Sequence, residues 1–336
     1  MGSKPHILLL GVGSVGAIHL LQLQRAGCTV TAVCRSNYAV VKEKGFTMRS
    51  VRFGNVTYRP DYIVRTIAEC PKDTVYDYVL VTTKCFPGSK PSVADLIRPA
   101  LIGRPETAIV LAQNGIEIEQ GIADEFPENP ILSGVVYLPT TQTSPGVIDY
   151  PEMLNMLELG TYPANAPAAH KAAASKLVAL MNQGGGEAKL HDDIQIARWT
   201  KLLINASWNP VCALSMCSDG DFLLSSEPFA KELVWGIMME IVALAKKVGI
   251  PGVDEEAARV RLQIATRRAE AGTGRDPSML QDVKQGRLFE VEAIVGNTVR
   301  LARKHAVSMP RLETVFALAK GRYEALARTQ SQGNSV

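Results

Sequence analysis

The stretch HILLLGVGSVGAIHLLQLQRAGCTVTAVCR, residues 6–35, holds the clearest structural pattern of the chain. Residues 6–10 are a short apolar run, and residues 17–25 carry apolar side chains at helical spacing after a glycine-rich turn. Residues 28–35 return to a mostly apolar run. A strand, a glycine turn, a helix and a second strand in this order predict a βαβ unit of a parallel sheet.

The glycine-rich turn GVGSVG fits the dinucleotide-binding pattern G-x-G-x-x-G. Its first glycine allows a tight turn, its second lets the backbone approach a pyrophosphate, and its third lets the helix pack on the strand. The free amides at the start of the helix favour a phosphate group. We therefore expect a cofactor site formed by Gly11, Val12, Gly13, Ser14, Val15 and Gly16.

The end of the second strand favours NADPH over NADH as the cofactor. An acidic residue there would bind the ribose 2'-hydroxyl of NADH, but this chain has Arg35 followed by Ser36. A guanidinium can bind the 2'-phosphate of NADPH with two charge-assisted hydrogen bonds. Lys84, at the carboxyl end of the strand predicted over 76–84, either adds a second positive contact or is simply solvated.

The first half of the chain is predicted to be doubly wound α/β. Between residues 139 and 162 the short strands indicate an antiparallel extension of the sheet, and from 193 onward the periodicity is helical. We expect a Rossmann domain with this extension in residues 1–192 and an all-helical substrate and catalytic domain in residues 193–336. Further strands are expected over 76–84, 107–115 and 131–138.

Composition points to a small molecule as the partner. The 336 residues are 46% hydrophobic with a formal net charge of +3, and no long basic run suggests binding to nucleic acid or to a membrane surface. No apolar run reaches the roughly 20 residues of a membrane span, so a cytoplasmic location is expected. Cysteines and histidines lack metal-site spacing. A homodimer is compatible with the apolar helices, as is a single folded core.

A polar stripe interrupts the apolar segment RWTKLLINASWNP, residues 198–210. Lys201, Asn205 and Asn209 are spaced four residues apart, which predicts one face of a helix. The remaining side chains are apolar, as in a helix buried on most sides. Pro210 would disrupt a continuing helix and leave backbone groups near it without partners. The stripe is expected to face something other than bulk water.

Lys201 is the candidate proton donor for reduction of a carbonyl. Hydride addition to the carbon requires a proton at the oxygen, and a lysine ammonium can supply it while stabilising the developing charge. Glu290 could be the carboxylate that keeps this lysine charged. The alternative interpretation is a lysine that extends to the surface and a glutamate that is solvated on its helix.

Two further segments have more than one interpretation. Asn114, in the Gln-Asn-Gly sequence that ends a strand, could contact ribose, nicotinamide or substrate, or could simply form a turn. Ser278 opens the sequence SMLQ, which matches a helix-capping box, and a capping hydroxyl can also face a ligand. The preceding loop, AGTGRDPS, is either a mobile lid or an ordinary interhelical loop.

The combined motifs resemble the ketopantoate reductase (2-dehydropantoate 2-reductase) family over nearly the whole chain. The segments that carry the resemblance, in the order of the family, are GVGSVG, VCRS, VTTK, AQNG, HDDIQIARWTKLLINASWNP and PSMLQDVKQGRLFEVEAIVGN. The resemblance implies a Rossmann domain, a helical domain, and NADPH and substrate in the cleft between them. It also implies NADPH-dependent reduction of 2-dehydropantoate to (R)-pantoate, a step toward pantothenate and coenzyme A.

The resemblance implies a role for each candidate residue. Lys201 is the general acid and Glu290 its supporting carboxylate. The family pattern places Asn205, Asn209 and Ser278 at the substrate. It places Gly11, Gly13, Gly16, Arg35, Lys84 and Asn114 around the cofactor.

Asp219 departs from the family pattern. The family commonly has an Asn-Gly pair after the NP motif, and that asparagine contacts the substrate, whereas this chain reads Ser-Asp-Gly-Asp over 218–221. A carboxylate there would repel a substrate carboxylate unless it is protonated, paired or turned away. Asp219→Asn would then improve ketopantoate turnover. Two rival hypotheses follow: a reductase of another carbonyl or imine compound, and a non-catalytic NADPH-binding sensor.

Overall fold

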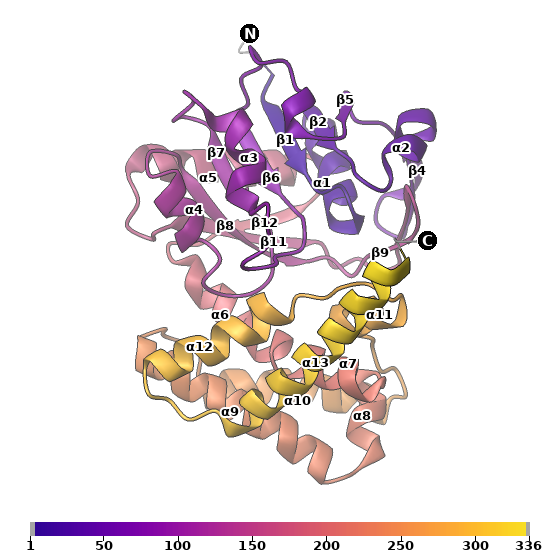
Figure 1. Ribbon diagram of the computed structural model, residues 1–336, viewed down its shortest axis with the longest axis vertical. Helices are drawn as coiled ribbons and strands as arrows, with labels where there is room; N and C mark the ends of the chain where they lie inside the picture. The colour runs from indigo at the N-terminus through magenta and orange to yellow at the C-terminus, as the bar shows by residue number, and fades with distance from the viewer. Residues whose placement is uncertain (1–3, 334–336) are drawn as a thin grey trace. The chain divides into compact units, whose positions relative to one another are not determined.

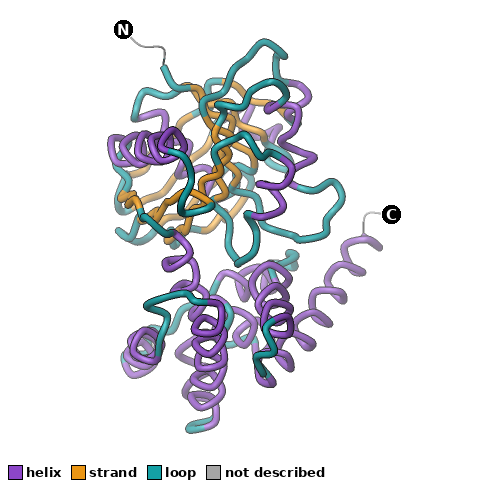
Figure 2. The backbone as a smooth tube through the Cα atoms, turned by 90° about the vertical axis from the view of Figure 1, so that its left-hand side faces the viewer, coloured by secondary structure: helices purple, strands orange, loops and turns teal. Residues whose placement is uncertain are grey.

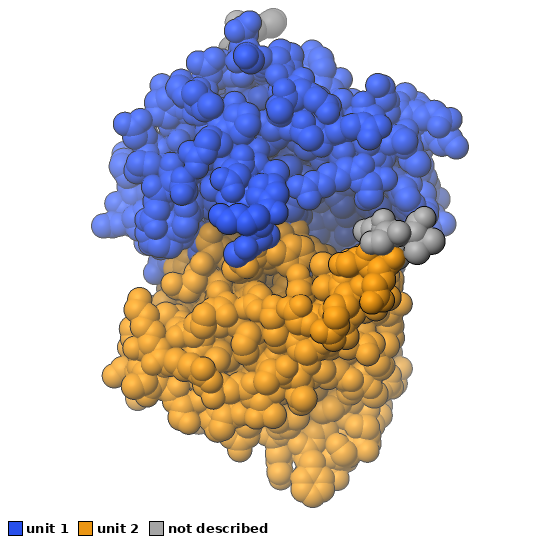
Figure 3. Space-filling model, viewed as in Figure 1, with its two compact units in different colours: residues 1–83, 88–113, 119–194 blue, residues 84–87, 114–118, 195–336 orange. Residues whose placement is uncertain are grey.

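The computed structural model describes residues 4–333 and divides the chain into two compact units. Unit 1 takes residues from 1–83, 88–113 and 119–194, and unit 2 takes residues from 84–87, 114–118 and 195–336 (Figure 3). The two short loops at 84–87 and 114–118 therefore group with the C-terminal unit, although they connect elements of the N-terminal one.

The main sheet of unit 1 has the strand order β12-β11-β8-β7-β6-β1-β2-β5 within the described residues. The neighbouring strands from β5 to β8 are parallel, and β11 is antiparallel to β8. The order reverses at β1, as in doubly wound dinucleotide-binding sheets. The strands are β1 (His6–Leu10), β2 (Thr29–Val33), β5 (Tyr62–Val64), β6 (Tyr78–Val81), β7 (Ala108–Leu111), β8 (Ile131–Tyr137), β11 (Met156–Tyr162) and β12 (Glu187–Leu190).

Helices lie on both sides of this sheet (Figure 2). The strands are buried on both faces, which explains their nearly continuous apolar sequences. One core cluster joins Leu9, Val30 and Leu80 to side chains of α1 and α5. The helical segments of unit 1 are α1 (Ser14–Arg25), α2 (Tyr38–Lys44), the short 3₁₀ helix η1 (Ile67–Glu69), α3 (Val93–Leu101), α4 (Gln120–Glu125) and α5 (Ala168–Gln183).

A second sheet of unit 1 corrects the expected antiparallel extension. Only β11 of the 139–162 segment joins the main sheet, whereas β9 (Thr141–Ser144) and β10 (Val147–Tyr150) form a hairpin in a separate sheet of order β4-β3-β10-β9. The partner strands β3 (Phe46–Ser50) and β4 (Gly54–Tyr58) were not expected. They are short and only partly apolar, and they bury mainly Phe46 and Met48.

Unit 2 is built of helices (Figure 1). Their apolar side chains form one continuous core. α9 contributes Val234, Ile237, Met238 and Ile241 to this core and packs against α8, α10 and α13. The helices are α6 (Ile194–Asn205, its first residue in unit 1), α7 (Trp208–Ser215), α8 (Asp219–Ser225), α9 (Phe229–Val248), α10 (Glu255–Glu270), α11 (Ser278–Lys284), the π-helical turn η2 (Glu292–Gly296), α12 (Asn297–Lys304) and α13 (Pro310–Gly333).

The predicted fold class, an N-terminal Rossmann sheet followed by a helical C-terminal part, is confirmed. Among residues 4–333, no helix has both the length and the apolar character that crossing a membrane requires.

Candidate active site

The glycine loop of unit 1 leaves its backbone accessible in front of α1. Gly11 has a φ of 93°, and a side chain there would overlap Thr83. A Cβ on Gly16 would lie 2.6 Å from the Gly11 carbonyl oxygen. By contrast, a Cβ on Gly13, the N-cap of α1, would meet no heavy atom of the described residues within 4 Å. Open space beside the unpaired amides of a helix start fits a pyrophosphate.

Gly13→Val is expected to weaken dinucleotide binding while the fold persists. Gly13 has a φ of −81°, which other residues adopt freely. The valine side chain would fill the space in front of the α1 amides and raise the dissociation constant for the dinucleotide by about tenfold or more, a loss of about 1.4 kcal/mol. Calorimetric titration measures the affinity, and thermal melting controls for folding. Unchanged affinity would show that this loop does not hold the pyrophosphate.

The segment after β2 is tied to the glycine loop. Arg35 and Ser36 are exposed, whereas Asn37 is buried and its Nδ2 donates to the Val12 carbonyl at 2.7 Å. This bond fixes the segment that carries Arg35 to the glycine loop at the carboxyl edge of the sheet. The role of Arg35 at a cofactor stays a prediction.

Two helices carry the polar stripe of residues 201–209, so the single continuous helix implied by its spacing is wrong. α6 ends at Asn205, which is half-buried, and α7 begins at Trp208. Pro210 accounts for the break because it has no amide hydrogen and is tolerated only in the first turn of a helix. Lys201 and Asn209 are therefore positioned by different helices.

A hydrogen-bond chain in unit 2 runs from Lys201 through Asn114 to Glu290. Lys201 Nζ donates to Asn114 Oδ1 at 2.9 Å, and Asn114 Nδ2 donates to Glu290 Oε2 at 3.1 Å. Glu290 Oε1 accepts from the Cys85 backbone amide at 2.9 Å. The carboxylate thus orients the amide, and the amide presents its oxygen to the ammonium. This network connects Glu290 to Lys201 through a neutral group.

The carboxyl group of Glu290 is buried, and this burial raises its pKa above the usual range because the charged form is removed from water. The amide hydrogens of Cys85 and Asn114 and the nearby charge of Lys84 oppose that rise, whereas Asp282 adds to it. Because two N–H groups donate to this buried carboxyl group, both of its oxygens act as hydrogen-bond acceptors in the network.

Polar contacts hold the loop at 84–87 within unit 2. Lys84 Nζ lies 2.5 Å from a carboxylate oxygen of Asp282 and donates to the Leu288 carbonyl at 2.9 Å. Arg287 also pairs with Asp282, at 3.1 Å. Lys84 is therefore engaged by its own unit, and a contact with a cofactor stays a prediction.

The loop at 114–118 is held by backbone contacts. Arg198 donates to the Gly115 carbonyl at 2.8 Å, and the Ile116 amide donates to the Ala293 carbonyl of the π-helical turn at 3.2 Å. Gly115 has a φ of 99°, and a Cβ there would collide with Ala293. Glycine is therefore needed at position 115. The close packing of this loop holds the preceding residue, Asn114, beside Lys201.

Asn209 and Ser278 lie next to each other in unit 2, with Asn209 Nδ2 3.5 Å from Ser278 Oγ. Asn209 is buried and Ser278 is exposed. Of the two interpretations of Ser278, the capping box is wrong: α11 begins at Ser278 itself, the N-cap is Pro277, and no side chain caps the helix. Gln281 Nε2 donates instead to the Asp276 carbonyl at 2.9 Å. The Ser278 hydroxyl is thus not used as a cap.

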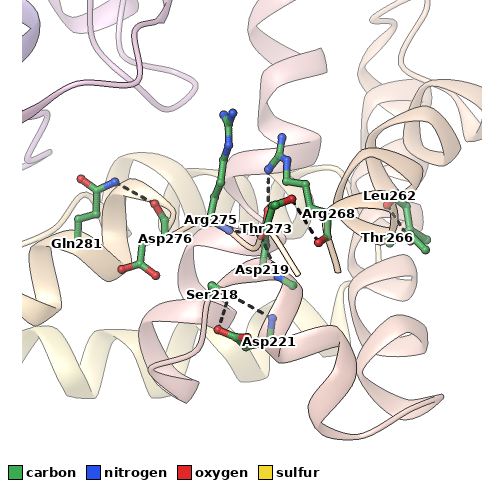
Figure 4. Close-up of polar contacts among 11 residues, drawn as sticks. Ser218, Asp219, Asp221, Leu262, Thr266, Arg268, Thr273, Arg275, Asp276 and Gln281 are labelled. Atoms are coloured by element: carbon green, nitrogen blue, oxygen red, sulfur yellow. Dashed lines mark hydrogen bonds and ion pairs between the residues drawn. The ribbon is translucent and has the colours of Figure 1, made fainter. Parts of the chain in front are cut away.

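The Asp219 carboxylate is buried and paired (Figure 4). Its Oδ2 accepts from Arg268 Nη1 at 2.7 Å, and its Oδ1 accepts from the backbone amides of Arg275 at 2.6 Å and Gly220 at 2.8 Å. The Asp219 amide donates to the Arg275 carbonyl at 2.9 Å. These bonds fasten the loop before Ser278 to the start of α8. Asp219 is therefore paired with a positive charge. Such pairing is one of the conditions under which Asp219 would not repel a substrate carboxylate.

Sequence reasoning missed Arg268, Asp282 and the Cys85 amide. The partners of Asp219 and Lys84 lie 49 and 198 positions along the chain, so no local motif marks them. The available signal was that a charged residue inside an apolar segment needs a partner of opposite charge.

Two family models match the chain in succession. The model described as "Ketopantoate reductase PanE/ApbA" matches residues 7–163, and "Ketopantoate reductase PanE/ApbA C terminal" matches residues 193–324. The crystal structure of 2-dehydropantoate 2-reductase from Methylococcus capsulatus is 33% identical with a TM-score of 0.82, over 96% of this chain and 97% of that one. The chain belongs to the ketopantoate reductase family.

Two further matches say less about the substrate. An uncharacterized protein of Saccharomyces cerevisiae is 31% identical over 335 residues, covering 93% of this chain and 92% of that protein. D-mandelate dehydrogenase, solved with NADH and anilino(oxo)acetate, has a TM-score of 0.80 at 22% identity over 96% and 99% of the two chains, which shows the fold alone. As a ketopantoate reductase family member, this protein is an oxidoreductase that acts on keto acids with a nicotinamide cofactor.

Proposed function

We propose that this protein reduces a 2-keto acid with NADPH as the reductant, and that 2-dehydropantoate is its leading substrate, giving (R)-pantoate for pantothenate synthesis. The observation that carries the proposal is the hydrogen-bond chain from Lys201 through Asn114 to Glu290. An ammonium held by a fixed amide oxygen can donate a proton to a carbonyl oxygen and stabilise the charge that forms on it.

The remaining candidate residues serve binding in this proposal. Asn205, Asn209 and Ser278 are neutral hydrogen-bonding groups, which suit a substrate that already carries a carboxylate. Lys201 gives its proton to the carbonyl oxygen, which becomes the hydroxyl of the product. The reduced nicotinamide, when bound, supplies the hydride that the carbonyl carbon accepts.

Cofactor binding is assigned in this proposal to the Rossmann domain of residues 1–192, and substrate binding and catalysis to residues 193–336. The glycine loop receives the pyrophosphate, and Arg35 receives the 2'-phosphate that distinguishes NADPH from NADH. Lys84 and Asn114, from the loops that group with unit 2, are proposed to border the cofactor as well.

The test is an assay of NADPH oxidation with ketopantoate and a panel of other 2-keto acids, followed by the absorbance of the reduced nicotinamide. Ketopantoate turnover with a kcat/KM on the order of 10⁴ M⁻¹s⁻¹ or better is expected. Faster turnover of another keto acid would keep the reaction type and change the substrate. NADPH binding without turnover of any carbonyl compound would support the sensor hypothesis and contradict the proposal.

A second candidate function is reduction of a carbonyl compound other than ketopantoate by the same residues. The observation that favours it is the Asp219–Arg268 pair, because family members commonly have a substrate-contacting asparagine where this chain has a carboxylate bound to a guanidinium. Without that asparagine, the substrate has one neutral hydrogen-bonding partner fewer.

Asp219→Asn is expected to lower stability and to leave ketopantoate turnover no better than in the parent. The amide would still accept from the backbone of Arg275 or Gly220, but Arg268 would lose its negative partner. Because Arg268 is partly exposed, the expected loss is about 1–3 kcal/mol of unfolding free energy. Urea unfolding and kcat/KM for ketopantoate measure the two effects. A gain in turnover with unchanged stability would restore the hypothesis that Asp219 repels the substrate.

A further inference from the structure

Three positively charged residues lie close to the points where β2 and β5 end in unit 1: Arg35 and Arg65 follow the two strands, and Lys42 shares the ring of Tyr38 with Arg65. The two strands are parallel neighbours with Val33 opposite Val64, and the Cys34 amide donates to the Val64 carbonyl at 2.9 Å. The chain therefore leaves the sheet at adjacent points, and the next residues along the two paths include Arg35 and Arg65. Both are exposed.

Tyr38 organises this edge. The guanidinium carbon of Arg65 lies 4.3 Å from the centre of the Tyr38 ring. Lys42 Nζ lies 5.4 Å from the same ring centre and 3.2 Å from the Tyr38 hydroxyl. A guanidinium held by an aromatic ring loses part of its freedom before any ligand arrives, so less entropy is lost when it binds an anion. We call Arg35, Lys42 and Arg65 the β2-edge cluster.

The β2-edge cluster has no ion-pair partner within the part of the chain that the structure describes. The Glu69 carboxylate approaches Arg65 only by accepting from its backbone amide, at 2.8 Å. Like charges at one edge repel one another, and the contacts with the Tyr38 ring do not neutralise them. An anionic ligand would give this arrangement its counter-charge.

The position of the β2-edge cluster identifies the ligand. Asn37 ties the segment after β2 to the glycine loop through the Val12 carbonyl. In a sheet of this order, the end of the second strand is where the adenosine ribose of a dinucleotide is recognised. A 2'-phosphate there carries close to two negative charges near neutral pH, and Arg35 supplies only one positive charge.

We propose that Arg65, held against Tyr38, is a second guanidinium for the 2'-phosphate of NADPH and a determinant of the preference for NADPH over NADH. This inference rests on the proposed function, which gives NADPH as the cofactor. It adds Arg65, which follows β5, the strand beside β2. Both guanidiniums together would balance the charge of the phosphate, and Lys42 would add to the local positive potential.

The experiment measures dissociation constants of the full-length protein for NADPH, NADH and adenosine 2',5'-bisphosphate by calorimetric titration. Arg65→Gln is expected to raise the constant for NADPH and for the bisphosphate by about tenfold, as for the loss of one charge-assisted hydrogen bond, with the constant for NADH unchanged. The salt dependence of NADPH binding should also weaken.

Arg25→Gln is the matched control. Arg25 is an exposed arginine of the same unit whose guanidinium carbon lies 5.0 Å from the centre of the Phe53 ring, so its substitution removes the same kind of arginine–aromatic pair elsewhere. It should leave all three constants unchanged.

The other outcomes distinguish failure of the Arg65 assignment from failure of the proposed function. Equal weakening of NADPH and NADH by Arg65→Gln would place Arg65 on the adenine and overturn the 2'-phosphate assignment. Unchanged NADPH affinity in this variant would overturn the role of Arg65 and leave the proposed function standing. If the parent protein binds neither NADPH nor NADH, the proposed function itself fails.

Discussion

Lys201→Ala is expected to lower kcat for keto acid reduction by about 10²- to 10⁴-fold, the range that a positioned general acid contributes. The substitution removes the ammonium that donates to Asn114 Oδ1 and leaves a methyl group where a carbonyl oxygen would receive its proton. Steady-state kinetics with the keto acid that proves best in the panel measures the loss. Because the glycine loop and Arg35, which we assign to the phosphates of the cofactor, are in unit 1, the NADPH dissociation constant should change far less than kcat.

Two further variants separate the proton donor from its charge and from general effects of removing a lysine. Lys201→Arg keeps the positive charge, but a guanidinium gives up its proton far less readily, so only part of the lost activity should return. Lys247→Ala, at an exposed lysine near the end of α9, is the matched control and should behave as the parent protein. Full activity in Lys201→Ala would remove Lys201 from the mechanism.

The sequence was sufficient for the parts of the molecule that depend on neighbouring residues. The glycine loop was predictable because a turn, a phosphate-facing amide and a packed helix each set a requirement within six residues. The short strands β6 and β7 were predictable because all four positions of each are buried, as in a parallel strand covered on both faces, so neither sequence is interrupted by a charged side chain. By contrast, β3 buries only two of its five residues and β4 buries none, so their mixed polar and apolar sequences do not stand out from loops.

The sequence could not assign the partners in the candidate site. Lys201 and Glu290 were both singled out, but the amide between them comes from position 114, which a turn motif explained equally well. Asp219 was identified as a misplaced charge, and the structure shows its partner on α10. Both partnerships join segments far apart in the chain, so they depend on tertiary packing that no periodicity encodes.

Glu290→Gln is expected to lower kcat/KM by about 100-fold, as for the loss of a charged acceptor from a buried network. A glutamine has one acceptor oxygen and one donor nitrogen, whereas Glu290 accepts from both Cys85 and Asn114. Its nitrogen would face one of these donors, so either the Cys85 backbone or the Asn114 amide must turn away. Reorientation of Asn114 would move the oxygen that holds the Lys201 ammonium.

The pH dependence distinguishes this role from simple packing. Burial raises the pKa of Glu290, so its protonated form appears at a higher pH than for an ordinary glutamate. A protonated carboxyl oxygen donates rather than accepts, so kcat/KM of the parent should fall as pH falls through that raised pKa, and Glu290→Gln should lack this acid limb. For stability the sign is opposite: a raised pKa favours the folded state below the ordinary range of glutamate, and this contribution is lost as pH rises through the raised value.

Glu292→Gln is the matched control for both profiles. Glu292 lies two residues away, and its carboxylate pairs with Arg300 at 2.8 Å and Lys320 at 3.0 Å. Its pKa is lowered: partial burial opposes the shift, and the contacts with these two cations outweigh it. The Glu292→Gln variant should therefore keep the acid limb of kcat/KM, and any loss of stability should be confined to pH values at which Glu292 is ionised. An acid limb that survives in Glu290→Gln would assign the limb to another group and leave Glu290 with a purely structural part in holding Asn114 and Cys85.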